Sequence, residues 1–240
     1  MLTRIRWTKA MQEDLLELRA DHPGWSTRKL SEEMGLPWKA VDNALYRYNA
    51  YPPEHWVDHV RTGFFDIETT DLRANRGFML CWGILATDGT IYSDCIRPSE
   101  IRSPNIEPDK RVVKSCLDAI EGHFDLLVTY NGTNFDVPFL RSRALVHGLL
   151  FPAYGQKLHV DMYYATKALL KLTNNRMGTA SAFLGGSDKD SYDIRVWNQA
   201  ARGDAEAIGH IYSHNLSDLH ITQERFVALG PYRKWMRKSI

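Results

Sequence analysis

The chain has 240 residues, 44% hydrophobic and 25% charged, and its 30 cationic and 29 anionic side chains give a formal net charge of +1. These proportions are typical of a soluble globular protein with one large domain, or with a large domain and a small partner. No apolar run reaches the roughly 18 residues that cross a bilayer, and the first residues lack the apolar core of a secretion signal, so we expect a cytoplasmic protein without a membrane partner.

The cysteines and the charge balance exclude two simple interpretations. Cys81, Cys95 and Cys116 are odd in number and widely spaced, which indicates reduced thiols rather than a disulfide framework or a structural zinc site. The near-zero net charge removes the argument for nucleic-acid binding from bulk electrostatics. It does not exclude nucleic acid, because bound divalent metals add positive charge at one place.

The first 50 residues predict a small helical module. Amphipathic spacing indicates helices over about 8–20, 27–34 and 38–48, and Gly35 and Pro37 separate the last two. A double proline then follows, which cannot continue a helix, so we place a linker at 51–60.

The pattern after the linker changes to an alternation of strands and helices. Short aliphatic and aromatic runs bounded by Gly, Asp and Asn predict strands, and helical spacing follows between and after them. Together they indicate an α/β fold, a mixed sheet flanked by helices, over 61–228, with a basic tail at 229–240. The strand segments begin at 61, 78, 91 and 125, and the helical segments are 109–122, 136–148, 161–171 and 204–228.

The most informative string in the sequence is FFDIETTDL, which contains Asp66 and Glu68. Side chains two apart on a strand project from the same face, so these carboxylates lie side by side. Two neighbouring anions repel each other, and a divalent cation between them offsets this repulsion. The alternative is a solvated strand end, which is the common explanation of a lone D-x-E.

Two later segments add acidic residues that change this balance. Asp136 follows an apolar strand and a Gly/Asn turn at the start of a helical stretch, where an ordinary N-cap is the alternative. His214 and Asp218 are four residues apart on a predicted helix and therefore share a face. A surface contact between the two is the alternative there.

In this order the motifs resemble the DEDD superfamily of 3′–5′ exonucleases, which has a ribonuclease-H-like fold and includes the proofreading domains of DNA polymerases. The first motif stands here as Phe64 to Thr70, and the second as Asn131 through Phe135-Asp136. The third motif reads Tyr-x-x-x-Asp in one branch and His-x-x-x-x-Asp in another. Here His214-x-x-x-Asp218 puts a histidine at the tyrosine spacing, which leaves the branch open.

The resemblance implies a phosphodiester hydrolase that uses two metal ions, Mg²⁺ or Mn²⁺, about 3.5 to 4 Å apart. It implies that Asp66 bridges both ions, that Glu68 and Asp218 complete the nucleophile-side site, and that Asp136 serves mainly the second ion. Four carboxylates suit such hard cations. Because imidazole titrates near neutral pH, His214 is the candidate to orient the attacking water or accept its proton.

Other polar residues have two interpretations each. Asn131 and Asn134 are candidates to contact nucleic acid, although Asn-Gly in a turn is explained by backbone geometry alone. Asp161 follows a short apolar run, and a helix-start cap is favoured over a place in the site. Two other functions remain open: an endonuclease with a ribonuclease-H-like fold, and a non-catalytic DNA-binding or scaffold protein.

The three-helix module resembles DNA-binding domains of the helix-turn-helix, homeodomain-like class. Small Ser31 precedes Gly35 by four residues at the helix crossing. In such a domain Lys39, Asn43 and Arg47 of the second helix of the motif face the major groove. Residues 1–60 carry eight Lys/Arg and nine Asp/Glu, however, so docking on the nuclease domain or on a protein partner remains the alternative. DNA is the favoured partner of the whole chain, with RNA also open.

Overall fold

The chain divides into two units, Met1–Val60 and Arg61–Ile240, which are described separately. The computed structural model describes residues 7–22, 25–47, 60–103, 107–186, 193–232 and 238–239. The linker expected at 51–60 lies outside the described residues, except for Val60.

The first unit contains the three predicted helices, α1 (Lys9–Asp21), α2 (Thr27–Glu33) and α3 (Trp38–Arg47). Hydroxyl N-caps begin the first two, because Thr8 accepts a hydrogen bond from Met11 N and Ser26 accepts one from Lys29 N. Between α2 and α3 the chain turns at Gly35, whose φ of 62° lies in the left-handed region that favours glycine. The buried core of this unit consists of Leu15, Leu30, Val41, Ala44 and Leu45.

The second unit is built on one six-stranded sheet with the order β3-β2-β1-β4-β5-β6. The strands are β1 (Thr62–Thr69), β2 (Met79–Ala86), β3 (Ile91–Cys95), β4 (Leu126–Thr129), β5 (Leu158–Asp161) and β6 (Lys238–Ser239). The helices are α5 (Pro98–Ile101), α6 (Lys110–His123), α7 (Asp136–Val146), α8 (Met162–Leu169), α9 (Met177–Leu184), α10 (Ile194–Ala200) and α11 (Ala205–Leu229), followed by the 3₁₀ turn η1 (Gly230–Tyr232).

The sheet is mixed, as predicted. Strands β1, β2 and β3 pair antiparallel in succession, whereas β4 pairs parallel with both β1 and β5. Strand β6 lies within the segment expected as a basic tail, and it pairs antiparallel with β5. The α/β fold class, a mixed sheet with flanking helices, is therefore confirmed.

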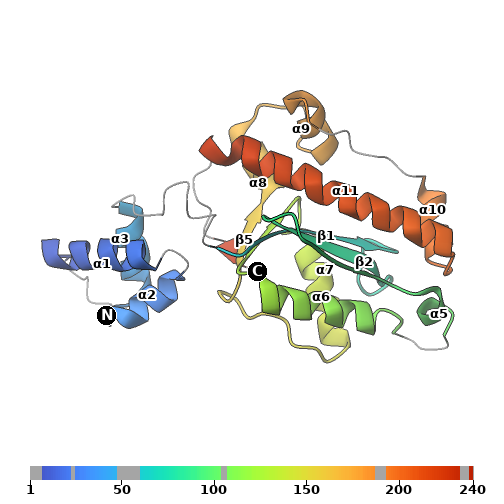
Figure 1. The fold of residues 1–240 in the computed structure, drawn as a ribbon, viewed down its shortest axis with the longest axis horizontal. Helices are drawn as coiled ribbons and strands as arrows, with labels where there is room; N and C mark the ends of the chain where they lie inside the picture. The colour runs from blue at the N-terminus through green and yellow to red at the C-terminus, as the bar shows by residue number, and fades with distance from the viewer. Residues whose placement is uncertain are drawn as a thin grey trace. The chain divides into compact units, whose positions relative to one another are not determined.

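Helices cover both faces of the sheet. In Figure 1 the long helix α11, in red, runs along one face, and α6 and α7, in green and yellow-green, lie on the other. The alternation along β1 follows this layering: Phe64 packs edge-on against Phe226 of α11 at 5.4 Å between ring centroids, and Phe65 and Ile67 enter the main core with residues of α6. Every second residue of β1 therefore faces α11.

A buried polar network links the start of β2 to α6 and α7. Asp109, fully buried before α6, accepts hydrogen bonds from Met79 N at 2.8 Å and from His147 Nε2 at 2.8 Å. Its two oxygens also accept from Arg143 Nε at 2.9 Å and Nη2 at 2.7 Å. This carboxylate links β2, α6 and α7, and α7 is the helix that begins at Asp136.

The predicted helices agree with α6, α7, α8 and α11 to within a few residues at each end. The sequence did not predict α5, α9 and α10, which have four, eight and seven residues. Helices α9 and α10 pack against α11, and such tertiary packing is not visible in a local pattern.

Candidate functional site

Strand β1 presents Asp66 and Glu68 on the face that α11 covers. Asp66 Oδ2 accepts a hydrogen bond of 2.7 Å from Asn215 Nδ2 of α11, and Glu68 Oε1 lies 3.8 Å from His214 Nε2 of the same helix. The register of β1 against β2 shifts between Glu68 and Thr69, a bulge that ends the regular pairing directly after the second carboxylate. The predicted pair of carboxylates therefore points toward α11.

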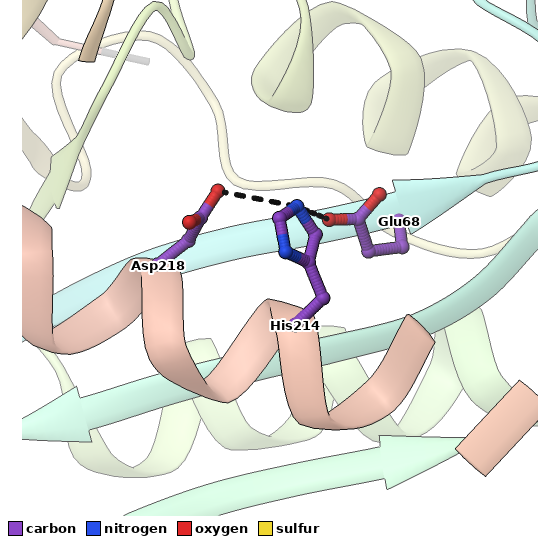
Figure 2. A group of neighbouring side chains, drawn as sticks. All are labelled: Glu68, His214 and Asp218. Atoms are coloured by element: carbon purple, nitrogen blue, oxygen red, sulfur yellow. Dashed lines mark ion pairs between the residues drawn. The ribbon is translucent and has the colours of Figure 1, made fainter. Parts of the chain in front are cut away.

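Helix α11 brings His214 and Asp218 to the same place. His214 Nε2 is 3.7 Å from Asp218 Oδ2, and both side chains are buried, with 7% and 4% of their surface exposed. Figure 2 shows the imidazole lying between the two carboxylates, with His214 and Asp218 one turn apart on the helix and Glu68 on the strand. One donor atom from each of these residues lies within 4.8 Å of the other two.

Asp136, at the start of α7, also contacts this stretch of β1. It begins α7, is 2% exposed, and its Oδ1 accepts a hydrogen bond of 3.0 Å from Ile67 N, the amide between Asp66 and Glu68. The predicted helix start at this residue is confirmed. The structure thus places Glu68, His214 and Asp218 in one cluster, while Asp66 and Asp136 are held beside it by Asn215 and by the β1 backbone.

Asp161, the last residue of β5, holds the loop between β4 and α7. This buried carboxylate accepts hydrogen bonds from Asn131 N at 2.8 Å and Thr133 N at 2.9 Å, and it also caps α8 by accepting from Tyr163 N at 3.0 Å. The expected helix-cap role of Asp161 is confirmed. It carries a second role that the sequence did not indicate, because it fixes the loop that leads into Asp136.

Asn131 and Asn134 contact each other in this loop. Asn134 Nδ2 donates to Asn131 Oδ1 at 2.7 Å, and Tyr164 of α8 donates to Asn134 Oδ1 at 3.2 Å. Asn131 has a φ of 71°, a left-handed backbone that asparagine tolerates better than most residues. Turn geometry therefore explains Asn131, as the alternative reading stated, and a contact with nucleic acid remains a proposal.

Asn215 of α11 and Gly83 of β2, which the sequence did not single out, bring α11 close to the sheet. Asn215, fully buried, follows His214 and binds Asp66. It packs over Gly83 of β2, where an added Cβ would lie 2.7 Å from Asn215 Oδ1 and 2.8 Å from Leu219 Cδ1. A lone glycine inside an apolar strand indicates such a close approach, and that signal was present in the sequence.

A further missed contact comes from α10. The Trp197 ring packs edge-on against the His214 imidazole, with 5.9 Å between ring centroids. The indole therefore packs against the imidazole and restricts its orientation.

The donor atoms of the cluster fit a divalent metal ion. Glu68 and Asp218 supply carboxylate oxygens, which suit hard cations such as Mg²⁺ and Mn²⁺, and no cysteine belongs to the group. The imidazole of His214 adds a nitrogen donor that Mn²⁺ accepts more readily than Mg²⁺ does. Glu68 and Asp218 are the carboxylates that would hold an ion, with Asp66 next to them on the same face of β1.

The candidate DNA-binding residues of the first unit lie on α3. Lys39 and Asn43 are exposed, and Lys39 Nζ lies 5.8 Å from the centroid of the Trp38 ring. Arg47 is the last residue of this helix, and its side chain lies outside the described part of the chain. Ser31 is buried, as the predicted helix crossing requires. In the described ranges, no helix is long and apolar enough to cross a membrane.

Known proteins resemble this chain in sequence and in fold. A family model of the RNase_H superfamily, RNase_H_2, matches residues 63–226, a range that includes all five candidate catalytic residues. A DNA polymerase of Methanocaldococcus jannaschii is 30% identical over 96 residues, covering 31% of this chain and 6% of that protein. The family B DNA polymerase of the hyperthermophilic archaeon Pyrobaculum calidifontis shares the fold, with a TM-score of 0.58 and 19% identity over 75% of this chain and 25% of that one. The chain therefore spans only a small part of either polymerase.

Proposed function

The chain belongs to the RNase_H superfamily, and on that premise we propose that it is a metal-dependent nuclease that removes nucleotides from the 3′ end of DNA. The observation that carries the proposal is the convergence of Glu68, His214 and Asp218, whose donor atoms lie within 4.8 Å of one another. Three residues from a strand and a helix far apart in the sequence meet here, in the region that the family model matches. The matched polymerases support DNA as the substrate.

Asp66, Glu68, Asp136 and Asp218 are the proposed ligands of two divalent ions, Mg²⁺ or Mn²⁺. When bound, such ions supply an activated water and stabilise the oxygen that leaves from the phosphodiester. The protein contributes a fixed set of anionic oxygens. The hydrogen bonds from Asn215 to Asp66 and from Ile67 N to Asp136 hold two of these carboxylates in place before an ion arrives.

His214 is proposed to orient the attacking water or to accept its proton. Its Nε2 lies between the carboxylates of Glu68 and Asp218, at 3.8 and 3.7 Å. Trp197 restricts the ring from one side. The imidazole is thus held among the proposed metal ligands, next to the place where an ion would bind a water.

The test is hydrolysis of 3′-labelled oligonucleotides by the purified chain, with and without Mg²⁺ or Mn²⁺. Glu68→Gln and Asp218→Asn are expected to lower the rate by at least about a hundredfold, because each removes a ligand charge. Glu206→Gln is the matched control, since this acid lies on the same helix with 86% of its side chain exposed. Equal rates for Glu68→Gln and Glu206→Gln would refute the proposal.

The same assay separates the alternatives. Stepwise release of mononucleotides supports a 3′–5′ exonuclease, whereas discrete internal fragments identify an endonuclease. Matched single-stranded DNA, duplex DNA and RNA establish the preferred substrate. Binding without any metal-dependent product indicates a DNA-binding or scaffold protein, and Asn131→Ala and Asn134→Ala then show whether the loop before α7 contacts the strand.

For the first unit we propose duplex DNA binding through Lys39, Asn43 and Arg47 of a helix-turn-helix. The support is the left-handed turn at Gly35 between α2 and α3, with exposed Lys39 and Asn43 on the second helix. Gel shifts of the full chain at two salt concentrations test this. Lys39→Ala should weaken duplex binding, and it should reduce the slope of log binding constant against log salt concentration by about one. Lys9→Ala on α1 should do neither. Equal effects of the two variants would favour a protein-docking module.

A further inference from the structure

Two cysteines lie opposite each other on neighbouring strands of the sheet. Cys81 of β2 pairs in register with Cys95 of the edge strand β3. One step further along the ladder, Ile96 N donates to Leu80 O at 2.7 Å, so that pair exchanges the backbone hydrogen bond. Because hydrogen-bonded and non-hydrogen-bonded pairs alternate, Cys81 and Cys95 form a non-hydrogen-bonded pair.

The spacing of such a pair suits a disulfide. Opposed Cα atoms at non-hydrogen-bonded positions are about 4.5 Å apart, and disulfides join Cα atoms about 4.4 to 6.8 Å apart. Side chains at these positions also lean toward each other. The cross-strand pairing therefore places the two cysteines within the range of a disulfide, and both thiols are free in this structure.

The two thiols differ in accessibility and acidity. Cys81 is fully buried, and burial raises the pKa of its thiol well above the usual value. Cys95 is partly exposed, and a hydrogen bond from Cys81 lowers the pKa of its thiol, an effect that burial and Asp94 oppose and the charge of Arg111 supports. Cys95 is therefore the thiol that reacts first with a reagent from solvent, and Cys81 is the buried thiol that reacts second.

We propose that Cys81 and Cys95 are a redox modification site that closes to a cross-strand disulfide by exchange with a small-molecule disulfide such as oxidised glutathione. The Cys95 thiolate attacks one sulfur of oxidised glutathione, forms a mixed disulfide and releases one glutathione thiolate. Cys81 then attacks the Cys95 sulfur, its proton passes to the second departing glutathione, and the Cys81–Cys95 bond forms. Two protein thiols are oxidised and one glutathione disulfide is reduced to two thiols.

The location gives this modification a consequence for the neighbouring site. Glu68 of β1 lies in register with Cys81, so Glu68, Cys81 and Cys95 form a row across three strands on the face toward α11. The bond would tie the edge strand to the strand next to Glu68. The third cysteine, Cys116, is buried in α6, the helix on the opposite face of the sheet, and serves as an internal reference.

The test uses the folded full chain incubated with oxidised glutathione, quenched in acid, alkylated under denaturing conditions and measured by mass spectrometry. The expected product has lost two hydrogens, keeps one alkylatable thiol at Cys116, and is restored by dithiothreitol. Trypsin leaves Cys81 and Cys95 in one peptide without Cys116, and a further chymotryptic cut between them leaves two fragments joined only by the bond. This readout is independent of nuclease activity, so the inference and the proposed function fail separately.

Serine variants test the order of the steps. Cys81→Ser should stop with one glutathione bound at Cys95, Cys95→Ser should remain unmodified, and Cys116→Ser should form the disulfide as the wild type does. Circular dichroism of each reduced variant checks its fold. Three alkylatable thiols in the treated wild type, a stable glutathione adduct, or a bond to Cys116 would overturn the proposal, and each can be read from the wild type alone.

Discussion

Replacing Gly83 by alanine should push α11 away from the sheet at the candidate site. The new methyl carbon would lie 2.7 Å from Asn215 Oδ1 and 2.8 Å from Leu219 Cδ1. Carbon atoms in contact are normally about 3.5 to 4.0 Å apart, so one partner must retreat by roughly 1 Å. Overpacking of this kind costs about 1 to 3 kcal/mol of unfolding free energy. Because Asn215 also binds Asp66, the displacement should weaken that hydrogen bond as well.

The assay is urea unfolding of wild type and variant, followed by Mn²⁺ titration of both. Gly209→Ala is the matched control, because Gly209 lies on α11, the helix that carries Asn215, with nothing within 4 Å of an added Cβ. A helical glycine replaced by alanine gains up to about 1 kcal/mol, so the two substitutions should change stability in opposite directions. Equal stability of Gly83→Ala and the wild type, with unchanged Mn²⁺ affinity, would refute the reasoning.

Three further substitutions test single contacts of the fold and the site. Asp109→Ala leaves buried Arg143 without its carboxylate and should cost about 3 to 5 kcal/mol in urea unfolding, whereas Asp118→Ala on the exposed side of α6 should change stability by less than about 0.5 kcal/mol. Asp161→Ala removes the acceptor of two loop amides and should cost about 1 to 3 kcal/mol while lowering the nuclease rate; an unchanged rate would show that the loop does not need this anchor. Asn215→Ala removes the hydrogen bond to Asp66 and should lower Mn²⁺ affinity about 10- to 100-fold, and unaltered affinity would contradict its positioning role.

Much of the fold was readable from local patterns. Apolar Phe65 and Ile67 alternate with Asp66 and Glu68, and this period of two predicted the strand β1. The long amphipathic stretch that contains His214 and Asp218 predicted α11, and the Gly/Asn turn before Asp136 predicted the start of α7. These elements share strong periodicity or explicit start signals, which act over a few residues.

The remaining features depend on tertiary packing, which no local pattern reveals. The role of Asn215 as a partner of Asp66 exists only because α11 lies directly over Gly83. Asp161 was correctly predicted as a cap, but its second role depends on β4 and β5 being parallel neighbours. Strand β6 has two residues, and it arises from pairing with β5 rather than from any preference of its own.

The structure groups three of the five candidate catalytic residues more tightly than the other two. The sequence indicated five residues in one place, and the structure brings Glu68, His214 and Asp218 into a single cluster. Asp66 and Asp136 lie next to it through separate hydrogen bonds. Side-chain hydrogen bonds decide this difference, because Asp66 turns toward Asn215 Nδ2 and Asp136 toward Ile67 N.

Mn²⁺ binding measured by calorimetry tests the central claim most directly, because it does not depend on the choice of nucleic acid. If Asp66, Glu68, Asp136 and Asp218 hold the ions, Glu68→Gln should weaken Mn²⁺ binding at least tenfold, and Glu206→Gln on the exposed side of α11 should leave it unchanged. Mn²⁺ binding of equal strength in the wild type and in both variants would contradict the account.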